Sequence, residues 1–106
     1  MNSKSLVKSI IDDSIRVKTL CAEQSIESIT AAGNLIANAV YSGRKILSCG
    51  NGGSAADAQH FSAELLNRFE KERKELGAIA LTTDSSTLTS IANDYSFDRI
   101  FEKQIR

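Results

Sequence analysis

The fold is decided by residues 45–54, which read KILSCGNGGS. Residues 45–49 form a short apolar run between the turn at Gly43 and Gly50, and such a run predicts a buried β-strand. Three of the six glycines of the chain follow within four residues, and Ser54 then opens an expected helix. Asp57 lies three residues after Ser54, which is a helix-capping spacing. The stretch therefore predicts a strand, a glycine loop and a helix in succession.

Downstream of this stretch the pattern predicts a second strand. The helix is expected to reach about Glu70, with an apolar side made by Ala58, Phe61, Leu65, Leu66 and Phe69. Residues 70–76 are a charge run, which predicts a solvated helix end and loop. Residues 78–82 are again apolar, so strand, loop, helix and strand form a βαβ unit with parallel strands and a right-handed crossover. Residues 88–92 and 97–106 are expected to be helical.

Upstream of the stretch the pattern predicts two helices. Residues 4–24 have apolar side chains at three- and four-residue spacings, which is typical of an amphipathic helix. The same spacing continues from Ile26 to Val40, and Gly43 suits a left-handed helix terminus. The two helices can form a hairpin whose apolar stripes are wide enough for both a core and a partner subunit.

Composition excludes several classes of protein. The chain has 106 residues, 42% of them hydrophobic, and its 13 basic and 13 acidic residues give no net charge. A neutral chain is not expected to bind nucleic acid, and no window reaches the roughly 18 apolar residues of a membrane span. The N-terminus lacks a signal-peptide core, and the two cysteines, Cys21 and Cys49, form no Cys-x-x-Cys pair. We therefore expect a cytoplasmic protein with two reduced, buried thiols.

The number of strands is low for such a protein. Parallel strands need cover on both faces, and doubly wound sheets usually contain more strands than the two expected here. We therefore expect the α/β domain to be incomplete in this chain.

The glycine loop is the first candidate site. Glycines at the carboxyl end of a parallel strand let the backbone approach a ligand, and the first amides of the next helix favour an anionic or polar group. No Gly-Lys-Ser/Thr ends the loop, so it is not a Walker loop. The spacing of Gly50, Gly52 and Ala55 does fit a loose dinucleotide fingerprint, with Asp84 as a possible ribose acceptor. A tight turn without any ligand is an equally good interpretation.

The next helix carries the second candidate site. Asp57, His60, Glu64 and Arg68 follow spacings of three, four and four residues, so they share one face. His60, the only histidine, and Glu64 can hold a divalent metal, or a carboxylate there can abstract a proton. Spacing alone favours an exposed ladder of side-chain pairs. The position of this face, one turn after the glycine loop, favours a functional role.

Asn93 and Asp94 form the third candidate site. They follow the short helix expected after the second strand, so they can reach the same crevice. Without further information, a helix cap or a turn is the better interpretation of this pair.

Taken together, these motifs resemble a known family. The runs SCGNGGS (48–54), DAQHF (57–61) with Glu64, AIAL (78–81) and IAND (91–94) are similar to those of the phosphoheptose isomerases, a branch of the sugar-isomerase (SIS) domain family. The resemblance implies a flavodoxin-like three-layer α/β/α sandwich with a parallel sheet. It implies N-terminal helices over residues 1–44, the first part of the SIS domain over residues 45–106, and a homotetramer.

The resemblance also implies an activity. It is the conversion of sedoheptulose 7-phosphate to D-glycero-D-manno-heptose 7-phosphate through an enediol, the first step toward bacterial heptose for the lipopolysaccharide core. Glu64 matches the catalytic carboxylate, and His60 and Glu64 match the ligands of a zinc ion. The residues that match substrate contacts are Asn51, Gly52, Gly53, Glu64, Asn93 and Asp94.

Two qualifications come with the resemblance. The chain matches the N-terminal half of the family, whose phosphate-gripping Ser/Thr-rich loop and whose Gln and His lie further on. A related SIS protein binds the bacterial replication initiator without isomerase chemistry, and this is the alternative function. That relative has a small residue at the position of Glu64, so Glu64 favours the isomerase.

Overall fold

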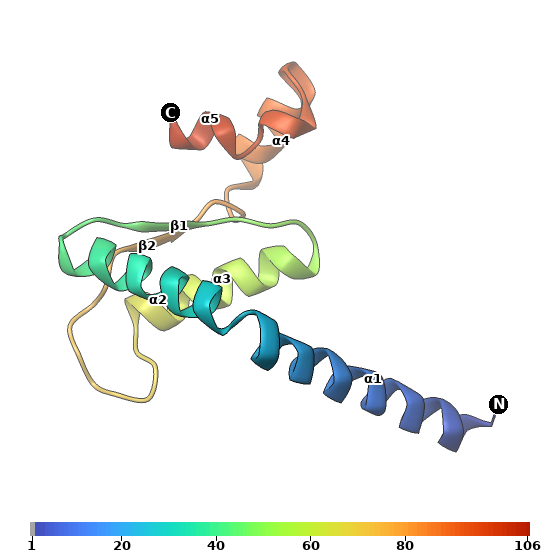
Figure 1. Cartoon of the computed structure of the whole chain (residues 1–106). Coiled ribbons are helices and arrows are strands. Elements are labelled where there is room, and N and C mark those ends of the chain that lie inside the picture. The colour runs from blue at the N-terminus through green and yellow to red at the C-terminus, as the bar shows by residue number, and fades with distance from the viewer. Residues whose placement is uncertain (1) are drawn as a thin grey trace. The chain divides into compact units, whose positions relative to one another are not determined.

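The computed structural model describes residues 2–106, which form six helical elements and two strands. Along the chain the elements are α1 (Ser3–Gln24), α2 (Ile26–Tyr41), β1 (Ile46–Ser48), α3 (Gly53–Leu66), β2 (Ala78–Ala80), α4 (Ser85–Asp94), the 3-10 helix η1 (Phe97–Arg99) and α5 (Glu102–Ile105) (Figure 1). They form two compact units, which divide inside α2 at Ala37. The domain boundaries expected from the sequence, 1–44 and 45–106, stay a prediction.

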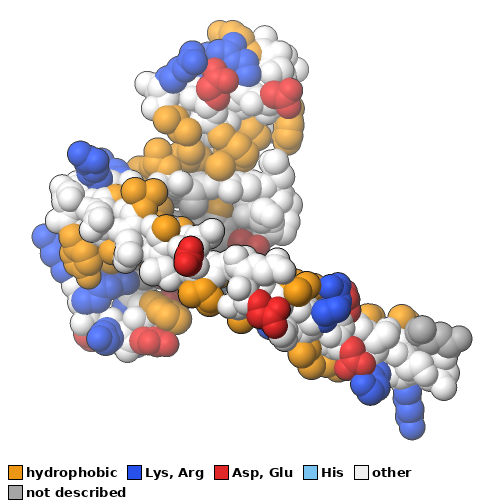
Figure 2. All heavy atoms as spheres, viewed as in Figure 1, with side chains coloured by type: hydrophobic (Ala, Val, Ile, Leu, Met, Phe, Trp, Pro, Cys, Tyr) orange, Lys and Arg blue, Asp and Glu red, His pale blue; other side chains and the backbone are white. Residues whose placement is uncertain are grey.

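The first unit consists of α1 and most of α2, and both helices agree with the spacing of apolar residues. The expectation that they form a hairpin is wrong, because α1 and α2 do not pack against each other. Asn2 caps α1, since its side-chain oxygen accepts a hydrogen bond from the Ser5 amide at 2.9 Å. Neither helix buries a residue. The expectation of buried thiols is wrong, because Cys21 on α1 and Cys49 after β1 are both exposed. Hydrophobic side chains are visible in bands along α1 (Figure 2). The exposed large apolar side chains of the unit are Leu6, Val7, Ile10, Ile11, Ile15, Val17, Leu20, Ile26, Ile29 and Leu35.

The second unit contains the predicted βαβ arrangement. β1 and β2 pair in parallel, with Ile46 opposite Ala78 and Ser48 opposite Ala80. α3 packs on one face of this pair, where the Ser48 hydroxyl donates a hydrogen bond of 2.9 Å to the Ala58 carbonyl. α4 and α5 lie on the opposite side of the strands from α3 (Figure 1). The parallel topology predicted from the sequence is confirmed.

The expectation of a buried strand is wrong in one respect. Leu47 and Ile79, which face each other across the pair, are 43% and 46% exposed. Their side chains alternate with those that face α3, and within the described residues no helix covers them fully. Because a parallel strand is buried only when both faces are covered, the apolar run of β1 is here buried on one face alone.

The boundaries of α3 differ from those predicted. The helix begins at Gly53 with Gly52 as its N-cap and without a side-chain cap, so the predicted capping role of Ser54 and Asp57 is wrong. Gly52 has φ +57°, and its backbone conformation, rather than a side chain, starts the helix. The helix ends at Leu66 and not near Glu70. The chain must return to β2, and Glu70 itself takes a left-handed φ of +62° in this turn.

The inward face of α3 is also narrower than predicted. Ala58 and Ser62 are buried against the strands, whereas the larger Phe61 and Leu66 are exposed. Ala78 and Ala80 on β2 face this helix, so small residues meet small residues and the helix lies close to the sheet.

The last part of the chain is helical, as predicted, and carries a small core. Leu81, Ile91 and Ile100 are buried there. Gln104 joins this part to the end of β2, because its amide donates to the carbonyls of Leu81 at 2.9 Å and Ile100 at 2.8 Å. Among residues 2–106, no helix has the length and hydropathy that crossing a membrane requires.

Candidate functional site

The loop between β1 and α3 has a backbone that only glycine fits at two positions. A Cβ atom on Gly50 would lie 2.5 Å from the Ser54 carbonyl oxygen, and Gly52 has a positive φ. The Ser54 amide donates to the Asn51 carbonyl at 3.0 Å and the Ala55 amide to the Gly52 carbonyl at 3.1 Å. Among the described residues, no backbone bond outside the regular elements uses the amides of Gly52 or Gly53. The start of α3 therefore offers free N–H groups to a ligand.

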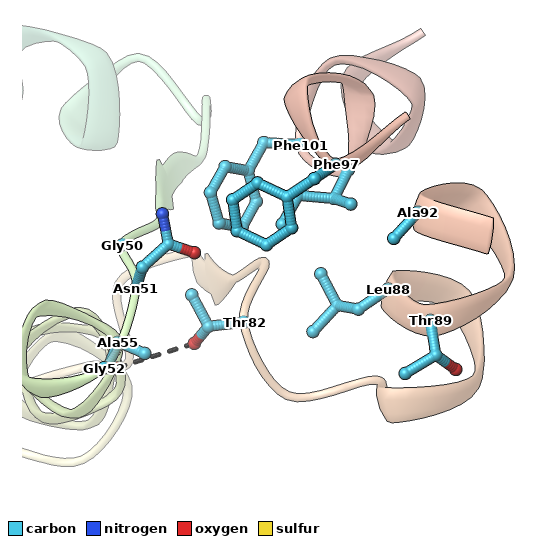
Figure 3. A pocket seen from close by; sticks show the side chains of 11 residues that line it. Gly50, Asn51, Gly52, Ala55, Thr82, Leu88, Thr89, Ala92, Phe97 and Phe101 are labelled. Atoms are coloured by element: carbon cyan, nitrogen blue, oxygen red, sulfur yellow. Dashed lines mark hydrogen bonds between the residues drawn. The ribbon is translucent and has the colours of Figure 1, made fainter. Parts of the chain in front are cut away.

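A cavity of about 340 Å³ opens beside this loop. Thr82, at the carboxyl end of β2, borders it near the loop, and its hydroxyl lies 3.5 Å from the Ala55 carbonyl. Phe97, Phe101 and Leu88 line the cavity on the side of the later helices (Figure 3). The full lining is Gly50, Asn51, Gly52, Ala55, Thr82, Leu88, Thr89, Ala92, Phe97, Ile100 and Phe101. The cavity thus has a polar side at the loop and an apolar side on the later helices.

His60 and Glu64 lie together on α3, as their spacing predicts. The His60 Nε2 atom is 2.9 Å from the Glu64 Oε1 atom, and the two side chains are 78% and 34% exposed. The half-buried carboxylate is therefore held by a neighbouring imidazole that solvent reaches freely. Neither residue lines the cavity beside the loop.

The fit of a metal ion to this pair can be tested on the donor set. Histidine nitrogen and carboxylate oxygen are both zinc ligands, and structural or catalytic zinc takes at least three protein ligands. Among residues 2–106, no group of three or more His, Cys, Asp and Glu side chains could hold a metal. His60 and Glu64 thus fit as two ligands of such a site, and the described residues supply no third.

The sequence predicts that Asn93 and Asp94 follow the short helix after β2. Instead, they form the last turn of that helix, α4. The Asn93 side-chain amide donates to the Asp94 carboxylate at 3.1 Å, and both residues are exposed. Asn93 borders a second, open hollow with Ser86, Thr89, Ser90 and Ala92. Thr89 and Ala92 line both hollows, so Asn93 lies next to the main cavity without lining it.

Asp84, the ribose acceptor that a dinucleotide site would need, is already engaged. It caps α4, with Oδ1 accepting from the Thr87 amide at 3.0 Å and Oδ2 from the Thr87 hydroxyl at 2.8 Å. These bonds, the amide bond first, hold the pKa of the exposed Asp84 carboxyl below its ordinary value. These bonds give Asp84 a structural role as the cap of α4, which favours that interpretation over a ribose contact.

Of the predicted site residues, the structure brings Asn51 and Gly52 to the cavity. Gly53 lies next to them at the start of α3, and the pair of His60 and Glu64 lies further along that helix. The cavity is also lined by residues that the motifs do not mark, which are Thr82, Leu88, Thr89, Phe97 and Phe101. Thr82 could have been found, because it ends the second strand at the same edge as the glycine loop. The two phenylalanines look like ordinary core residues at helical spacing, and no local signal marks them.

Comparison with known proteins shows the family to which this fold belongs. The family model that describes the SIS domain matches residues 11–106 of this chain. The chain belongs to the SIS-domain family. This confirms the fold class, and the two strands with their glycine loop are part of an SIS sheet.

Similar SIS-domain proteins are named phosphoheptose isomerase. The phosphoheptose isomerases of Alkalilimnicola ehrlichii and Halorhodospira halophila are each 59% identical over 106 residues, which is 100% of this chain and 54% of theirs. Solved structures of the phosphoheptose isomerases of Neisseria gonorrhoeae and Francisella tularensis superpose with TM-scores of 0.89 and 0.91. They are 45% and 42% identical, and the match covers 99% of this chain and 54% and 55% of theirs. The chain thus spans about half the length of these relatives.

Proposed function

We propose that this SIS-domain chain is part of a phosphoheptose isomerase. The proposed substrate is sedoheptulose 7-phosphate, and the proposed product is D-glycero-D-manno-heptose 7-phosphate. The observation that carries the proposal is Glu64, a half-buried carboxylate paired with His60 on the helix that follows the glycine loop. Relatives 59% identical over the whole chain bear that enzyme's name. The expected role in heptose supply for lipopolysaccharide, in the cytoplasm, follows from this substrate.

The proposed reaction is a proton transfer between two neighbouring carbons. The Glu64 carboxylate removes a proton from C1 of the ketose while the C2 carbonyl oxygen gains one, which gives a 1,2-enediol. Loss of the O1 proton forms the C1 aldehyde, and C2 takes up a proton, so the overall reaction is an isomerisation. The His60 Nε2 atom lies 2.9 Å from the Glu64 carboxylate, so His60 is placed to orient it.

The glycine loop is the proposed binding site of the substrate. The free amides of Gly52 and Gly53 and the positive end of α3 suit the oxygens of a sugar phosphate. Asn51, at the edge of the cavity, can donate to or accept from sugar hydroxyls. We assign Asn93 and Asp94 to a further substrate contact from the end of α4.

Zinc is the cofactor that we propose, with His60 and Glu64 as two of its ligands. A bound zinc ion supplies Lewis acidity, which stabilises the negative charge of an enediolate. The proposal predicts that zinc content, measured by elemental analysis of the purified protein, falls on His60→Gln. Equal zinc content in the variant and the wild type would contradict the assignment of His60.

We propose a homo-oligomer, and a tetramer in particular, that assembles through the first unit. Its apolar side chains on α1 and α2 are exposed, and burying such a stripe is the main driving force for helix association. Sedimentation of the wild type as an oligomer, and of Ile10→Asp with Ile11→Asp as a smaller species, is the expected result. A monomeric wild type would contradict it.

The test of the proposed function is turnover by the protein made from the complete gene. Sedoheptulose 7-phosphate is the substrate, and the aldose product is followed by nuclear magnetic resonance. Glu64→Gln should reduce kcat by about 10²-fold or more, because general-base catalysis contributes on this scale. Glu72→Gln, which removes an exposed carboxylate of the charge run, is the matched control and should leave kcat unchanged. Turnover by Glu64→Gln at the wild-type rate would refute the assignment.

A further inference from the structure

The charge run after α3 contains one residue that is not a solvated side chain. Arg73 is half-buried, and its guanidinium reaches back to the end of α3. Nη2 donates to the Glu64 carbonyl at 2.6 Å, and Nη1 donates to the carbonyls of Leu65 at 3.0 Å and Asn67 at 3.2 Å. It also lies 3.3 Å from the carbonyl of Lys74. One side chain thus binds the last turn of the helix.

This arrangement meets a general need of helix ends. The last carbonyls of a helix have no partner within the helix, and a cation there is favoured by the helix dipole. A guanidinium presents several N–H groups in a rigid plane, so it can bind neighbouring carbonyls at once, which an ammonium cannot do in the same geometry. The Leu76 amide, which donates to the Leu65 carbonyl at 3.1 Å, holds the same turn from the strand side.

We propose that Arg73 is the positioning residue of Glu64, an inference that rests on the proposed function. The peptide carbonyl of Glu64 is bound by Arg73 and its carboxylate contacts His60, so the residue is held at both ends. A catalytic base must be fixed to within a fraction of an ångström, and a misplacement of about 1 Å can cost about 10²-fold in rate. Arg73 fixes the backbone from which the carboxylate extends.

The proposal predicts that changes at Arg73 lower kcat and leave KM nearly unchanged. Arg73→Gln removes the cation and the planar donors, and Arg73→Lys keeps a cation without the fork. Both variants should lower kcat by about tenfold or more, since the base is less well placed. Both should leave KM for sedoheptulose 7-phosphate within about twofold, because the loop of residues 50–53 keeps its own hydrogen bonds. Lys71→Gln, an exposed residue of the same run, is the control and should match the wild type.

A double-mutant cycle distinguishes positioning from general stability. If Arg73 acts through the Glu64 carboxylate, Arg73→Gln should not reduce further the residual turnover of Glu64→Gln. A loss of folded protein would lower both backgrounds equally, so kcat is expressed per folded molecule, with the folded fraction taken from circular dichroism.

Each outcome has a definite meaning. Undiminished kcat in Arg73→Gln and Arg73→Lys, or the same fractional loss in both backgrounds, overturns the positioning role and leaves the proposed function standing. An inactive wild type overturns the proposed function, and the positioning role falls with it. A kcat loss confined to the background with Glu64 supports both.

Discussion

Replacement of Gly50 by alanine tests whether the glycine loop is packed as closely as the structure shows. Gly50 lies two residues after the end of β1, and a Cβ atom added to it would point at the first turn of α3. An added Cβ would lie 2.5 Å from the Ser54 carbonyl oxygen, 2.6 Å from its carbonyl carbon and 2.7 Å from its Cβ. All three atoms belong to or adjoin the helix backbone, so no flexible side chain can move aside.

The magnitude follows from that distance. Ordinary contact begins at 3.4 Å, so the loop and the helix must separate by about 0.9 Å. Forcing a methyl group into a packed site costs about 1–3 kcal/mol. Replacing glycine by alanine also reduces the conformational entropy of the unfolded chain. This effect raises the free energy of unfolding by about 0.4–1 kcal/mol, but only where alanine can adopt the native backbone conformation without strain. We therefore expect Gly50→Ala to lower the free energy of unfolding by about 1–3 kcal/mol.

The assay is urea unfolding of the chain, followed by circular dichroism. With a slope of about 1–3 kcal/mol per molar urea, the midpoint of Gly50→Ala should fall by roughly 1 M. Gly53→Ala is the matched control: it lies three residues away at the start of α3, and nothing approaches its added Cβ within 4 Å. That variant should equal or exceed the wild type in stability. Equal midpoints for the two alanine variants would refute the close packing of Gly50 on Ser54.

Three further predictions concern other parts of the chain. Gly33→Ala, in the middle of α2 with nothing within 4 Å of the added Cβ, should raise the free energy of unfolding by about 0.5–1 kcal/mol in the same assay. Gln104→Leu leaves the carbonyls of Leu81 and Ile100 without their side-chain donor and should lower it by about 1–3 kcal/mol, whereas Lys103→Leu next to it should cost less. For Asp84, the lowered pKa means that the carboxylate stabilises the fold above its ordinary pKa of 3.8, and that this contribution is lost as the pH falls through the lower folded value. The urea midpoint of the wild type should therefore approach that of Asp84→Asn as the pH falls below 3.8, and a constant difference at all pH values would contradict the cap.

The order of elements follows from the sequence because each element depends on local periodicity. The helices over residues 4–24 and from Ile26, the two strands and their parallel pairing all agree with the apolar spacing. The pairing of His60 with Glu64 follows in the same way, since residues four apart share a helix face.

What the sequence did not predict depends on contacts distant along the chain. The spacing of α3 allowed Phe61 as an inward residue, but the alanines of β2 admit only Ala58 and Ser62 at that distance. The sequence predicts that Ser54 caps α3, but Gly52 is the N-cap. Its positive φ starts the helix without a side-chain cap. Arg73 looked like one charge among several, and only the return of the chain toward β2 brings it to the end of α3.

The charge distribution of the cavity limits what this chain does by itself. None of the 11 residues that line the cavity carries a charge. The proposed sugar phosphate substrate brings about two negative charges, and the groups proposed to meet them are the free amides of Gly52 and Gly53 and the partial charge of about +0.5 at the start of α3. Amides and a half charge orient a phosphate but do not neutralise it, so we expect the binding of inorganic phosphate by the 106-residue chain to be weak and to depend little on salt. Glu64 lies further along α3 and does not line this cavity. In the proposed reaction, one helix would present an anion-binding end and, further along, the carboxylate of Glu64 to different parts of the same substrate.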